Sequence, residues 1–92
     1  MKNDPAYKTL LQAIIDEEAK QTGKMYVGIL ASKFGIEVDF DFKIKKYSGH
    51  GQKTAKQLVT RFIDFGGEAT RIKLIKATQP VLDANPKIKL NI

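Results

Sequence analysis

The feature that most constrains this chain is an amphipathic helical pattern between Ser48 and Phe65. Its apolar residues recur three and four positions apart, which is the spacing of one face of an α-helix. These residues are Ala55, Leu58, Val59, Phe62 and Ile63. Gly66 and Gly67 follow directly, and glycine tolerates the positive φ angles that end helices. Such a helix buries its apolar face, so the rest of the chain must supply a second layer that packs against it.

The start of this helix is rich in glycine and positive charge. Gly49, His50 and Gly51 lead into Lys53 and Lys56. A helix start carries partial positive charge and free N–H groups, which suit an anion, whereas lysines there slightly destabilise the helix. The pattern therefore indicates that these five residues contact phosphate.

A second helix is predicted between Asp4 and Gly23. Asp4 is a suitable cap, Pro5 fits the first helical position, and Gly23 can end the helix. The apolar residues with helical spacing are Tyr7, Leu10, Leu11, Ile14 and Ile15. We therefore expect a helix with one apolar face.

The segment 24–46 is predicted as two strands joined by a turn. Residues 25–31 form a continuous apolar run, which fits either a buried strand or a helix. Residues 36–45 then alternate apolar and polar side chains, as in a half-buried strand. The alternative is a helix followed by one strand. In that case four residues share the buried helix face: Val27, Leu30, Ala31 and Phe34.

Two further strands are predicted after the glycine pair. One spans 70–76, where Ile72 and Leu74 alternate with polar residues, and the other spans 88–92. The element order is then αββαββ. The chain is predicted to be a single α+β domain covering residues 1–92, with two helices packed on one face of a four-stranded antiparallel sheet.

Basic side chains alternate with core residues along the predicted strands. Neighbouring strands would bring these basic residues together on the open face of the sheet. They are Lys43, Lys45, Arg71, Lys73, Lys87 and Lys89. The net charge of +6 favours a polyanionic partner. The alternative is a solvated, lysine-rich sheet face that only deters edge pairing.

The stretch from Phe42 to Gln57 resembles the strand-to-helix end of a double-stranded RNA-binding domain. That family has a final strand, a glycine-rich turn and a helix that opens with Lys-Lys-x-Ala-Lys. Lys53 and Lys56 match the second and third of those lysines. Gln52 stands where the first lysine would be, and the family's Gly-Pro-x-His loop is not present. The resemblance implies shape-based recognition of an A-form RNA duplex through its phosphates.

Neither an enzyme nor a metal site is predicted. Glu37, Asp39 and Asp41 share one strand face, but such neighbours lie roughly 7 Å apart, too far to hold one ion together. His50 has only Ser48 nearby and no orienting partner, so it does not form a general base. The glycines lack the spacing of a phosphate-binding loop, and no cofactor is expected.

The expected partner is nucleic acid, RNA rather than DNA, or a ribonucleoprotein, in the cytoplasm and away from membranes. No apolar run approaches the roughly 20 residues that span a bilayer, and the N-terminus holds no signal-peptide core. The alternative, from a different class, is a small phage-type inhibitor or accessory protein. Such a protein would be similar in size and character to anti-CRISPR proteins and would bind a protein or ribonucleoprotein partner.

Overall fold

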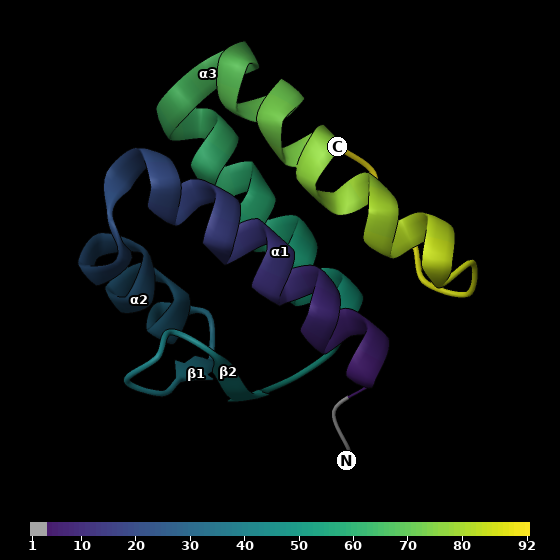
Figure 1. The fold of residues 1–92 in the computed structure, drawn as a ribbon, viewed down its shortest axis with the longest axis horizontal. Coiled ribbons are helices and arrows are strands. Elements are labelled where there is room, and N and C mark those ends of the chain that lie inside the picture. Colours follow the sequence, from purple (N-terminus) through teal and green to yellow (C-terminus); the bar gives the residue numbers. More distant parts are fainter. Residues whose placement is uncertain (1–3) are drawn as a thin grey trace.

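The chain forms three helices and two short strands in the computed structural model, which describes residues 4–92 (Figure 1). In chain order they are α1 (Pro5–Thr22), α2 (Lys24–Lys33), β1 (Ile36–Val38), β2 (Ile44–Tyr47) and α3 (Gly51–Ala84). In Figure 1, α1 lies between α2 on one side and the second half of α3 on the other. The helices therefore pack mainly on one another, and the strands cover one end.

The predicted N-terminal helix is confirmed as α1. The Asp4 carboxylate accepts a hydrogen bond from the Ala6 N–H at 2.8 Å, and Pro5 occupies the first helical position. Gly23 follows the last helical residue with a φ of 93°. The apolar face of α1 is fully buried at Leu10, Leu11, Ile14 and Ile15.

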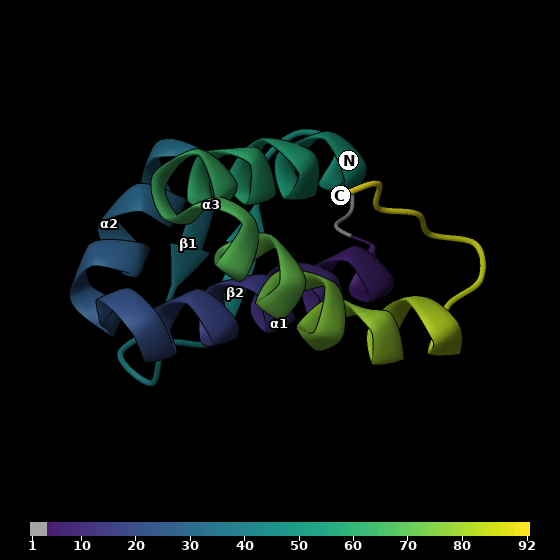
Figure 2. The same cartoon turned by 90° about the horizontal axis from the view of Figure 1, so that it is seen from above.

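The helix α3 consists of two segments that meet at Gly67. The backbone of Gly67 has φ 72° and ψ −156°, which is not helical. A straight helix of 34 residues would be about 51 Å long, whereas the longest dimension of the molecule is 32 Å. The chain turns back at Gly67, so that the first half (51–66) and the second half (68–84) both flank α1 (Figures 1 and 2). The predicted helix end at the glycine pair is confirmed.

The predicted four-stranded sheet is wrong. The structure has one two-stranded antiparallel sheet, in which Ile36 pairs with Tyr47. The apolar run after residue 24 is the helix α2, as in the alternative interpretation, because its buried residues lie three and four positions apart. Residues 70–76 belong to the second half of α3, and 88–92 form an irregular tail. The element order is ααββα.

The alternating segment 36–45 bends into a hairpin instead of forming one strand. The Asp39 carboxylate accepts hydrogen bonds from the N–H groups of Asp41 and Lys43, at 2.9 and 3.0 Å, and so stabilises the turn. Phe42 adopts a positive φ of 62°. The alternating pattern predicts that Phe40 and Phe42 both face the core. The Phe42 side chain is buried, but the prediction is wrong for Phe40, which is 97% exposed at the tip of the turn. The reversal changes which face each side chain takes.

One side chain of α1 fastens the hairpin to the helices. The Gln12 amide donates to the Phe42 carbonyl at 2.9 Å, and its oxygen accepts from the Ile44 N–H at 2.8 Å. At the turn, the Phe42 carbonyl and the Ile44 N–H thus bond to the Gln12 side chain in place of a backbone partner. The position of the start of β2 therefore depends on α1.

The core contains one buried carboxyl group. Glu18, on α1, is 1% exposed, and its Oε1 has no hydrogen-bond partner among the described residues. Burial raises the pKa of the Glu18 carboxyl, the charge of Glu17 raises it further, and Lys73 on α3 acts in the opposite direction. The interface between α1 and the second half of α3 thus holds an uncompensated polar group.

Candidate nucleic-acid interface

The turn between β2 and α3 presents an uncapped helix start. The Ser48 N–H donates to the Gly35 carbonyl at 3.0 Å, and Gly49 then takes a positive φ of 77°. His50 is the N-cap residue of α3, and its side chain makes no capping hydrogen bond. The first N–H groups of a helix have no partner within the helix, so this end of α3 is suited to an anion.

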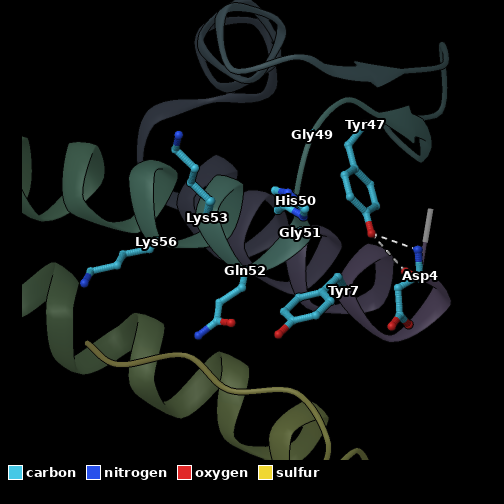
Figure 3. Close-up of a pocket in the computed structure, with 9 residues that line it drawn as sticks. All are labelled: Asp4, Tyr7, Tyr47, Gly49, His50, Gly51, Gln52, Lys53 and Lys56. Atoms are coloured by element: carbon cyan, nitrogen blue, oxygen red, sulfur yellow. Dashed lines mark hydrogen bonds between the residues drawn. The ribbon is translucent and has the colours of Figure 1, made fainter. Parts of the chain in front are cut away.

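A surface hollow surrounds this helix start (Figure 3). Its lining comes from the start of α1, the end of β2 and the start of α3, and consists of Asp4, Tyr7, Tyr47, Gly49, His50, Gly51, Gln52, Lys53 and Lys56. Five of these are the residues predicted to contact phosphate. The structure therefore gathers that part of the predicted site in one place.

Two contacts hold the hollow in shape. The Tyr47 hydroxyl accepts from the Asp4 N–H at 2.9 Å and donates to the Asp4 carbonyl at 3.2 Å (Figure 3). Burial raises the pKa of the Tyr47 phenol, which keeps it protonated as a donor. A Cβ atom on Gly51 would lie 2.4 Å from the Tyr7 Cβ, so only glycine fits this close approach between α1 and α3.

The hollow carries positive charge that no neighbouring carboxylate neutralises. Within residues 4–92, neither Lys53 nor Lys56 forms an ion pair. The one carboxylate in the lining, that of Asp4, caps α1. Figure 3 shows the two lysine side chains leaving α3 in different directions, so their ammonium groups do not converge on one point. This arrangement suits separate phosphates of a polymer better than one small anion.

The second predicted basic surface does not form, because the sheet that would carry it does not exist. The six basic residues are split between three places, with Lys43 and Lys45 on the hairpin, Arg71 and Lys73 on the second half of α3, and Lys87 and Lys89 on the tail. Two of the six are paired, since Lys45 Nζ lies 3.4 Å from a Glu37 oxygen and Arg71 Nη1 lies 2.8 Å from a Glu68 oxygen. These residues do not join the hollow.

The acidic residues of the hairpin have structural partners. Asp39 stabilises the turn, and Glu37 lies within 4 Å of Lys45 and Lys46. Across the described part of the chain, no three His, Cys, Asp or Glu side chains are grouped to hold a metal ion. None of the helices in residues 4–92 has both the length and the apolar character needed to cross a bilayer.

Sequence reasoning missed the outer face of the first half of α3. Gln57, Thr60 and Arg61 are exposed there and continue the line of Lys53 and Lys56. A shallow groove follows this line, with Phe34 on its other side. The signal was present in the sequence, because a helix whose inner face is apolar displays the intervening residues to solvent.

Comparison with protein-family models, with curated proteins and with solved structures finds no match for this chain.

Proposed function

We propose that this chain is a non-enzymatic nucleic-acid-binding domain that contacts the phosphate backbone through the start of α3. The contacting residues are Gly49, His50, Gly51, Lys53 and Lys56. The observation that supports this most directly is the uncapped helix start, which opens beside two unpaired lysines in one hollow. A cytoplasmic location and a free nucleic acid or ribonucleoprotein as the partner complete the proposal.

The chemistry of the hollow fits a phosphate chain in two ways. Backbone N–H groups at a helix start bind phosphate oxygens, and the helix dipole adds attraction. The lysines neutralise further phosphates and release counterions, which makes binding dependent on salt. The resemblance to a double-stranded RNA-binding domain favours RNA, while phosphate contacts of this kind are common to RNA and DNA.

The test is a titration of the chain with labelled duplex RNA, duplex DNA and single strands over a range of salt concentration. A variant with Lys53→Gln and Lys56→Gln should bind all of them more weakly and lower the slope of log K against log salt by about 2, or about 1 per lysine. The matched control is Lys87→Gln with Lys89→Gln, which removes the same charge from the tail. Equal effects of the two double variants would refute the site, and undetectable binding of the unaltered chain at low salt would refute the function.

A protein partner is the second candidate, in keeping with a small inhibitor or accessory protein. Met25, on α2, is 82% exposed, and Ile29 is also exposed on the same helix. Phe65, at the end of the first half of α3, is 70% exposed, and its ring centroid lies 6.2 Å from that of Tyr26. Exposed apolar side chains that gather in this way are typical of protein-binding surfaces. Substituting Met25 and Phe65 with serine should then abolish partner binding and leave nucleic-acid binding unchanged.

A further inference from the structure

The first half of α3 presents a polar outer face whose side chains have no structural partner. The face comprises Lys53, Lys56, Gln57, Thr60, Arg61 and Asp64, all exposed and spaced three or four positions apart. We call it the α3 outer face. Within residues 4–92, none of these six side chains takes part in a hydrogen bond or ion pair. Only one of the six is acidic, and it lies at the far end.

Some side chains of the same types are engaged elsewhere in the molecule. Arg71 is bound to Glu68, and Gln12 and Gln79 each donate to an aspartate four residues further on. Arg61, the other arginine of the chain, has no such contact. The only other arginine of the chain and two glutamines on neighbouring segments are thus held by carboxylates, whereas Gln57 and Arg61 on the outer face are available for a partner.

We propose that the α3 outer face enters the major groove of duplex DNA and reads base edges there. This inference rests on the proposed function and names duplex DNA as the polymer, in place of the RNA that the resemblance to a double-stranded RNA-binding domain implies. Glutamine pairs with the major-groove edge of adenine and arginine with that of guanine, each through two hydrogen bonds, and threonine can contact either base or the thymine methyl group. Gln57, Thr60 and Arg61 supply this set on adjacent turns of one helix. Lys53 and Lys56 then contact phosphates at the edge of the groove.

The dimensions favour B-form DNA over RNA. The uninterrupted segment 51–66 is about 24 Å long, and a helix with its side chains is about 10–12 Å wide. The B-DNA major groove is about 12 Å wide and admits such a helix, whereas the A-form RNA major groove is deep and too narrow for side chains to read. Figure 2 shows the first half of α3 along one edge of the molecule, the placement that a helix entering a groove requires.

The experiment first selects DNA duplexes that the full chain retains from a random pool, and then measures affinities for the selected sequence. We expect a recurring motif containing adenine and guanine, and tighter binding to this duplex than to the RNA duplex of the same sequence. The variant Gln57→Ala with Arg61→Ala should lose selected-over-random discrimination by roughly 5- to 150-fold for each lost contact, while its salt-dependent binding to random DNA persists. The control, Gln21→Ala with Lys76→Ala, alters exposed residues of matching polarity away from the face.

The outcomes separate this inference from the proposed function. If no motif emerges, if RNA binds as tightly as DNA, or if the Gln57 and Arg61 variant discriminates as well as the unaltered chain, base reading by α3 is refuted although phosphate binding stands. If the chain binds neither polymer, both proposals are refuted. Circular dichroism of each variant should show that the helices are retained, since these side chains make no hydrogen bond or ion pair within residues 4–92.

Discussion

Replacing Gly67 with alanine tests the central feature of the fold, which is the reversal of α3. Gly67 has φ 72° and ψ −156°, a region of backbone conformation that is essentially restricted to glycine. An added Cβ atom would meet nothing within 4 Å. The substitution therefore perturbs the backbone without creating a steric clash or a cavity.

The expected cost follows from the backbone alone. Holding a residue with a side chain in such a region costs of order 1–3 kcal/mol, so we expect Gly67→Ala to lower the free energy of unfolding by about 2 kcal/mol. For a domain of this size, 1 kcal/mol shifts the melting temperature by about 4–8 °C. The variant should therefore melt about 8–16 °C below the unaltered protein.

Chemical and thermal denaturation followed by circular dichroism measure this difference. Gly28→Ala is the matched control, because Gly28 lies inside α2 with an ordinary helical φ, and its added Cβ would sit 3.8 Å from Phe42. Alanine there should stabilise the protein by roughly 0.5–1 kcal/mol. If Gly67→Ala changes the stability by less than about 0.5 kcal/mol, the reversal at Gly67 is wrong and α3 is straighter than described.

Two further substitutions probe the anchoring of the hairpin and the buried carboxyl. Gln12→Ala leaves the Ile44 N–H and the Phe42 carbonyl without their partner and should cost about 1–3 kcal/mol in denaturant unfolding; a cost near zero would mean that the hairpin is not fastened to α1. Glu18→Gln should flatten the pH dependence of stability, measured by melting at several pH values. Because the folded-state pKa of Glu18 is raised, the folded protein binds this proton more tightly, so stability falls as the pH rises from about 4.5 through the folded pKa. An unchanged slope in the variant would contradict this assignment.

The sequence predicts α1 and the first half of α3 well because both have local signals at each end and an apolar face. In α1 the signals are Asp4 and Gly23, and in α3 they are the glycine turn and Gly67. The same local reasoning predicted that the residues around His50 act together, and in the structure they line one hollow. A turn and the helix start that follows it stay close together in any fold. These predictions needed no knowledge of distant contacts.

The second half of α3 escaped prediction because its buried face is partly polar. The face consists of Thr70, Leu74 and Thr78, and a pattern of apolar residues alone does not reveal it. The Thr78 hydroxyl donates to the Leu74 carbonyl at 2.8 Å, which satisfies it inside the core. Ile72 alternates with Leu74 as in a strand, yet it is 45% exposed, so helical packing overrides its strand preference. Pro80 lies on an exposed part of the helix, where water can satisfy the carbonyl that proline leaves free.

The scattering of the predicted basic sheet face has a different cause. Whether Lys43, Arg71 and Lys87 come together depends on which segments are neighbours, and long-range topology is not encoded in a local pattern. Residues 70–76 were predicted as a strand but are helical, and this one error was enough to predict a basic sheet face that the structure lacks. The hollow at the start of α3 survived this error because none of its basic residues lies in a segment whose structure was wrongly predicted.

The inner face of the first half of α3 is needed for stability, whereas we propose that its outer face is needed for binding. On the inner face, Leu58, Val59 and Phe62 are buried, and replacing any of them would open a cavity in the core. On the outer face, Gln57 and Arg61 make no contact that folding needs, so substituting them should change stability by less than about 0.5 kcal/mol. A loss of discrimination between DNA sequences in a variant that melts at the same temperature therefore assigns the outer face to binding. Gly67→Ala should give the opposite result, because it lowers stability although Gly67 is not one of the proposed contact residues.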